Sequence, residues 1–99
     1  MDSIVAAISA SSGVARERIR STEKSRAVVA ARHLCAYLAT RSLGLSARQV
    51  CRSLGLASPS LVAYARRAVE QRREREPAFD EQVHALQARL QGAQRDFAW

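Results

Sequence analysis

The residues most able to do chemistry in this 99-residue sequence are arginines. Fifteen of the sixteen basic residues are arginine, and Lys24 is the only lysine. Residues 16–52 hold nine basic residues against two acidic ones, which gives this segment a net charge of +7. A guanidinium carries its N–H donors in a rigid planar fork that matches phosphate oxygens and guanine edges. The clustering indicates a polyanionic partner, and the alternative is a generally basic surface with no such partner.

The remaining reactive side chains do not form a catalytic or metal-binding set. Cys35 and Cys51 each stand in an apolar helical stripe, which favours packing in the core. His33 and His84 complete no zinc-ligand spacing with them, and no nucleophile, base and acid follow a known motif order. We therefore expect no enzyme, metal, cofactor or small-molecule substrate.

The sequence also carries no sign of a membrane segment. No stretch is long and apolar enough to cross a bilayer. The start, with Asp2 and no basic segment, does not resemble a signal peptide. We expect a cytoplasmic protein without a membrane partner.

Helical periodicity runs through almost the whole chain, and no run of alternating β-branched residues predicts a strand. Apolar residues recur every three or four positions in the segments 2–13, 14–21, 26–44, 46–54, 58–76 and 78–91. Between the second and third segments, the polar and basic stretch 20–26 reads as a loop. The sequence predicts a compact all-α domain of five to six helices over residues 1–92, followed by a tail at 93–99.

The stretch 46–72 predicts a helix-turn-helix. Ser46 and Gln49 form the S-x-x-Q pattern of a capping box, which starts the first helix. Gly55 ends that helix, because a left-handed residue is favoured there. A serine followed by Pro59 starts the second helix, since proline at the first helical position loses no hydrogen bond. Two core helices that meet at a glycine would show the same pattern.

In a helix-turn-helix, the N-terminal turn of the second helix enters the major groove of DNA. Small side chains at Ser58 and Ser60 would allow the helix to approach closely, and Tyr64 and Arg67 would reach base edges or backbone from further along. On the first helix, the exposed side carries two arginines suited to phosphate contacts, Arg48 and Arg52. The second helix would then present one outward face made of Ser60, Ala63, Tyr64 and Arg67.

The run VVAARHLCAYLATRSLGLSARQVCRSLGLASPSLVAYARRAVEQRR resembles the C-terminal DNA-binding domain of the bacterial replication initiator DnaA. The resemblance covers the chain from about Ile4 to Leu90, and its most specific pieces are AARHLCAYL, LSARQVCRSLG and LVAYARRAVEQ. It implies a helix-turn-helix fold of the DnaA C-terminal or Trp-repressor type. It also implies binding of double-stranded DNA, in replication initiation or transcription regulation.

The resemblance also implies roles for individual residues. The recognition helix, 58–72, would lie in the major groove. The family's basic loop reaches the minor groove, and its counterpart here is the stretch 24–26, with Lys24 and Arg26 as the contacts. Arg32 matches the family's arginine at the start of the long helix and would contact phosphate.

The chain departs from the family at the start of the recognition helix. Where the family has Asp-His-Thr-Thr, this sequence has Ser58, Pro59, Ser60 and Leu61. Ser60 keeps a hydroxyl, Pro59 cannot donate, and Leu61 is free either to touch a thymine methyl or to pack. The expectation is DNA binding, and this departure leaves the target sequence open. The phosphate-binding motif of the initiator ATPase is also absent, so we expect a separate DnaA-like protein or an excised domain.

Two alternatives stay open. In the first, the domain is a DnaA-like interaction module that contacts a replication or regulatory protein. Phe97 and Trp99 would then be docking residues, and the alternative for these two residues is an untethered tail. In the second alternative, the domain coats DNA without sequence preference.

Overall fold

Six helices make up most of the computed structural model, which describes the backbone of residues 1–97 and the side chains of residues 1–92. No strand occurs within residues 1–97, and the all-α prediction is confirmed. The docking prediction for Phe97 and Trp99 falls on side chains outside the described residues. In chain order the helices are α1 (Asp2–Ser12), α2 (Arg16–Ile19), α3 (Arg26–Arg41), α4 (Ala47–Leu54), α5 (Pro59–Arg75) and α6 (Pro77–Phe97).

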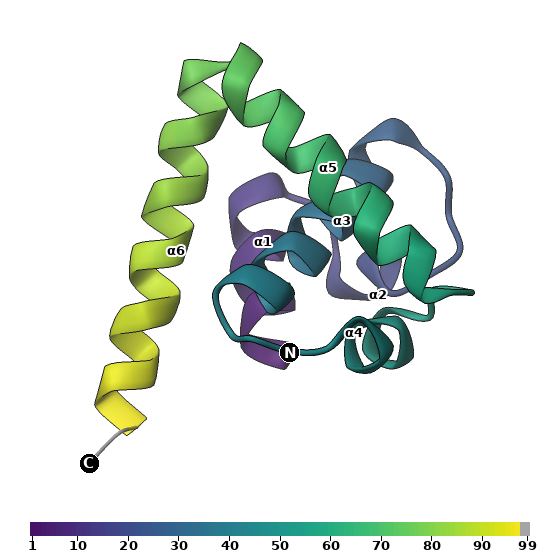
Figure 1. Ribbon diagram of the computed structural model, residues 1–99, viewed down its shortest axis with the longest axis horizontal. Helices are drawn as coiled ribbons and strands as arrows, with labels where there is room; N and C mark the ends of the chain where they lie inside the picture. Colours follow the sequence, from purple (N-terminus) through teal and green to yellow (C-terminus); the bar gives the residue numbers. More distant parts are fainter. Residues whose placement is uncertain (98–99) are drawn as a thin grey trace.

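Helix α3 forms the centre of the core, and α1, α2, α4 and α5 pack around it (Figure 1). Its apolar stripe is fully buried at Val28, Cys35 and Leu38. Burying each such aliphatic side chain stabilises a fold by roughly 1.5–3 kcal/mol. Burial also raises the pKa of the Cys35 thiol to about 12, so this cysteine is a neutral packing residue, as the sequence indicates.

Helix α6 covers the side of the molecule formed by α5 and α1, and it stands at the left of Figure 1. It begins at Pro77, directly after α5, as the sequence predicts. Phe79, Val83 and Leu86 are buried along it. Its backbone stays helical past residue 92, into the segment expected to be a tail, because no proline interrupts it there. Among the described residues, no helix is long and apolar enough to span a membrane.

The helix ends follow the predicted rules with small differences. The capping box of α4 is present, since Gln49 N–H donates to Ser46 Oγ at 3.1 Å and Ser46 N–H donates to Gln49 Oε1 at 2.8 Å. Met1 precedes α1 as its N-cap. Helix α3 starts at Arg26, as the predicted segment 26–44 does, and α5 continues to Arg75.

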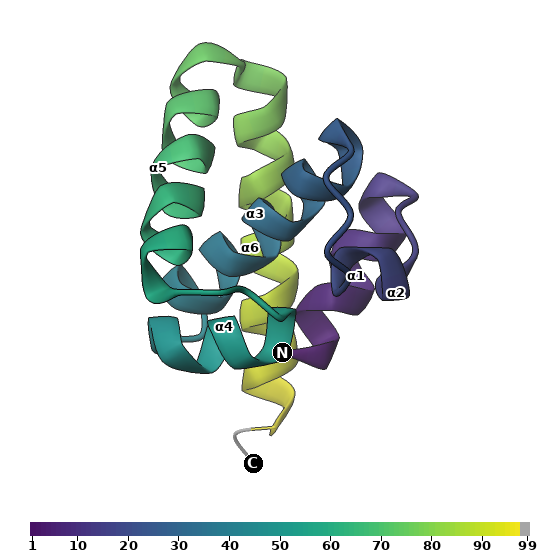
Figure 2. The same cartoon turned by 90° about the vertical axis from the view of Figure 1, so that its right-hand side faces the viewer.

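The two parts of the predicted DNA-binding surface lie on one side of the molecule. The loop between α2 and α3 and the turn between α4 and α5 both lie at the right of Figure 1, and both face the viewer in Figure 2. Helix α6 lies on the opposite side.

Candidate nucleic-acid interface

The α4–α5 hairpin is fixed at its turn by Gly55. The residue has φ +69°, in the left-handed region that favours glycine, and Leu56 N–H donates to Cys51 O at 3.0 Å. A Cβ at this glycine would lie 3.6 Å from the carbonyl oxygen of Arg20, which begins the α2–α3 loop. The hairpin turn therefore packs directly against the loop, and the two parts of the candidate interface meet there.

The predicted outward face of α5 is exposed. Its four residues are all exposed, while Val62 on the opposite face is buried. The exposed residues are Ser60, Ala63, Tyr64 and Arg67. Within residues 1–92, Arg67 forms no ion pair, and Glu70, three residues later, pairs with Arg41 at 3.7 Å.

Tyr64 is exposed and also contacts α3. Its side chain is 59% exposed, yet one edge of its ring meets His33 of α3, with ring centroids 5.6 Å apart and planes at 72°. Partial burial lowers the pKa of His33, so this imidazole is neutral at pH 7. This contact with His33 limits the motion of the Tyr64 ring, while much of the side chain stays exposed to solvent.

The side chains of the first turn of α5 carry few free polar groups. The hydroxyls of Ser58 and Ser60 hydrogen-bond to each other at 2.7 Å, and Ser58 makes no side-chain cap bond to the helix. Pro59 has no N–H to offer. Leu61 is 42% exposed, so it does not pack into the core. The tip of this helix is therefore apolar over much of its surface.

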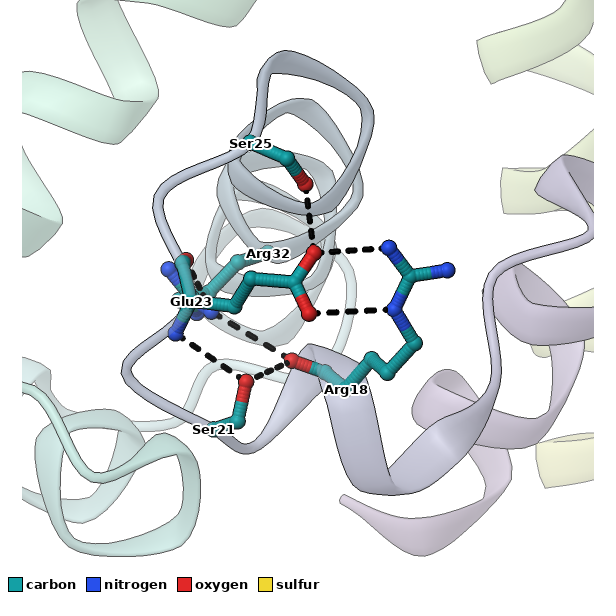
Figure 3. A network of polar contacts seen from close by, with 5 residues as sticks. All are labelled: Arg18, Ser21, Glu23, Ser25 and Arg32. Atoms are coloured by element: carbon teal, nitrogen blue, oxygen red, sulfur yellow. Dashed lines mark hydrogen bonds and ion pairs between the residues drawn. The ribbon is translucent and has the colours of Figure 1, made fainter.

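The structure gives Arg32 a different place from the phosphate contact expected of it. Its side chain is buried, with 8% of the residue exposed, beneath the α2–α3 loop (Figure 3). The guanidinium donates through Nε to Ile19 O at 2.9 Å and through Nη2 to Glu23 O at 3.1 Å and Arg18 O at 3.4 Å. The physical reason is that carbonyls at the end of α2 and in the loop after it lie outside a continuing helix, and a buried arginine supplies donors to them.

A carboxylate closes the same network from the outer side of the loop. Glu23 accepts from Arg18 Nη2 at 2.6 Å, from Arg18 Nε at 3.1 Å and from Ser25 Oγ at 2.6 Å (Figure 3). The bonds from Arg18 and Ser25 lower the pKa of Glu23 to about 2, so the carboxylate is charged at neutral pH. The loop is thereby held in one shape, with Lys24 and Arg26 exposed on it.

Helix α4 adds two more exposed cations, Arg48 and Arg52. The sequence did not single out the loop network, nor the ion pair that joins Arg20 to Asp2 of α1. The sequence does contain a sign of the loop network. Arg32 stands four residues after Val28 and three before Cys35, which are the positions of the buried stripe. An arginine at such a position is expected to turn inward only when it finds acceptors.

Together, these features define a helix-turn-helix domain with a basic loop against its turn. The sequence model of the family described as bacterial DnaA protein helix-turn-helix matches residues 1–69. The chain belongs to this family, and membership indicates DNA binding. The match covers α1 to α4 and most of α5, whereas α6 lies beyond it. A search of curated proteins finds no match to the chain.

Proposed function

We propose that this domain binds double-stranded DNA with the start of α5 in the major groove and the 24–26 loop at the adjacent minor groove. The cellular setting that fits is replication initiation or transcription regulation, in the cytoplasm. In this arrangement the exposed cations of α4 hold the phosphates between the two grooves.

One observation carries the proposal. Within residues 1–92, none of the five exposed basic residues assigned to DNA has an acidic partner, and five other arginines of the chain do. Cations without partners are available to replace the counterions of a phosphate backbone. The five are Lys24, Arg26, Arg48, Arg52 and Arg67. The paired arginines are Arg18, Arg20, Arg41, Arg72 and Arg73.

The loop and the hairpin support each other in this arrangement. The contact of Gly55 with the Arg20 carbonyl fixes the distance between loop and recognition helix. A fixed spacing lowers the entropy lost on binding, because neither part has to search for its groove. Arg32 acts here as a positioning residue for the loop rather than as a contact.

The test is duplex affinity measured across a range of salt concentrations. The double variant Arg26→Glu/Arg67→Glu is expected to lose binding, and the wild type is expected to weaken steeply as salt rises. The matched control is Arg75→Glu/Arg89→Glu, which makes the same change of net charge at two exposed residues near the end of α5 and on α6. Equal losses in the two variants, or no loss in the first, would contradict the proposed surface.

A protein-interaction role is the second candidate function, and the exposed apolar residues of α5 are the observation that favours it. In that case a replication or regulatory protein would be captured by the wild type and by the Arg26→Glu/Arg67→Glu variant alike, whereas Leu61→Ala/Tyr64→Ala would release it.

A further inference from the structure

Two large hydrophobic side chains stand exposed on the recognition helix. Leu61 is 42% exposed and Tyr64 is 59% exposed, and no other large hydrophobic residue among the described side chains is exposed. They are three positions apart on α5 and therefore neighbours along its surface. Because the described surface has no other exposed pair of this kind, we expect these two side chains to contact a partner.

The charges around this pair select the kind of partner. Arg67 lies one turn further along the same helix, and Lys24 is exposed on the loop that packs against the hairpin, with Arg26 exposed at the start of α3 directly after it. An apolar patch that shares its side of the domain with unpaired cations (Figures 1 and 2) fits a surface that is negative at its edges and apolar at its centre. The major groove offers this combination, because phosphates line it and the C5 methyl of thymine projects into it.

The polar groups of the helix tip favour the same reading. One hydrogen bond joins the hydroxyls of Ser58 and Ser60 and uses one of their two O–H donors, and Pro59 has no N–H. The side chains of the tip therefore keep a single O–H donor for base edges. Thymine is the one base that presents a methyl group in the major groove, and apolar side chains recognise it by contact.

We infer that the first two turns of α5 read thymine through its methyl group, with Leu61 as the main contact and Tyr64 as a second contact one turn on. Sequence choice then comes from apolar contact and not from hydrogen bonds to base edges. The inference rests on the DNA binding proposed above and names the feature of DNA that α5 selects. It predicts bound sites with A·T pairs at the positions facing α5.

The experiment begins with selection of bound duplexes from a random pool. In the selected duplex, each thymine is then replaced in turn by deoxyuridine, which removes the methyl and leaves pairing and charge unchanged. One or two of these replacements are expected to weaken binding about fourfold each, the factor that corresponds to the ~0.8 kcal/mol of one buried methylene-sized group. Replacements elsewhere in the duplex serve as the matched control.

The variant Leu61→Ala assigns the effect to its residue. It is expected to bind the thymine and deoxyuridine duplexes within twofold of each other at the sensitive position. Tyr64→Phe keeps the ring and is expected to retain the wild-type difference. Because Leu61 is exposed, thermal unfolding of Leu61→Ala serves to show that the fold is intact.

The outcomes separate the two levels of the proposal. Binding that ignores every methyl, in a protein that binds duplexes with steep salt dependence, overturns the thymine inference and leaves DNA binding standing. Absence of duplex binding at any salt concentration overturns both. Self-association that Leu61→Ala abolishes, together with unchanged duplex affinity of that variant, assigns the patch to a second copy of the chain and overturns the inference.

Discussion

The loop between α2 and α3 and the tip of α5 lie on the same face of the domain, yet they are built in opposite ways. In the loop, a buried guanidinium satisfies three backbone carbonyls and a carboxylate is held by two neighbours. At the helix tip, the side chains are exposed and make few bonds. A helix satisfies its own backbone and leaves its side chains free for a partner, whereas an irregular loop needs internal donors before it can present a fixed shape.

The largest expected effect is on the free energy of unfolding, which should fall when the loop network is disrupted and stay nearly unchanged when the helix tip is altered. Arg32→Met removes the donors of the Ile19 and Glu23 carbonyls and is expected to lower the free energy of unfolding by about 2–3 kcal/mol. Leu61→Ala is expected to change it by less than about 0.5 kcal/mol, because that side chain is exposed. Urea unfolding of both variants checks this. Comparable effects from the two substitutions would remove the distinction between a clamped loop and an open tip.

The next largest effect on stability is expected at Gly55, where the hairpin turn meets the loop. Gly55→Ala forces a Cβ into the left-handed region, at a cost of about 1–2 kcal/mol. Gly92→Ala in α6, where a Cβ meets no atom within 4 Å, is the control and is expected to stabilise the fold by about 0.5–1 kcal/mol. Thermal unfolding measures both, and a destabilising Gly92→Ala paired with a neutral Gly55→Ala would contradict the account of the turn.

A smaller effect concerns binding alone. Lys24→Ala removes an exposed charge from the clamped loop and is expected to leave stability unchanged. The slope of the logarithm of affinity against the logarithm of salt concentration should become shallower by about 0.9, the value for one lost phosphate contact. Lys24→Arg is the matched control and should keep the slope. A slope unaltered by Lys24→Ala would place the loop outside the interface.

The smallest expected effect is the response of the loop to acid. The pKa of Glu23 is about 2 in the folded chain against an ordinary value of 4.5, so the bonds of its carboxylate stabilise the fold fully above pH 4.5. That stabilisation is lost as the pH falls from 4.5 towards 2. Unfolding of wild type and Glu23→Gln is the measurement, and their difference should shrink over this interval. A difference that grows with acidity would contradict the assigned network.

The helix-turn-helix was predictable because its signals are local. Ser46, Gly55 and Pro59 each act on the backbone within a few residues, so the sequence reveals where the two helices start and end. The inward turn of Arg32 was not predicted, because its acceptors are carbonyls at the end of α2 and in the loop after it, nine to fourteen residues earlier in the chain, and any residue type supplies a carbonyl. For Leu61, the sequence left contact and packing equally open, and only the packing of α5 on α3 and α4 decided that it is exposed.

The central claim is that the loop and the start of α5 act as one DNA-binding surface. The most direct measurement is the change of amide NMR shifts during titration with a selected duplex. The account predicts that the shifts change together at residues 24–26, 48–52 and 58–67, with α6 unaffected. Changes confined to α6, or changes in α5 that leave the loop untouched at saturation, would contradict it.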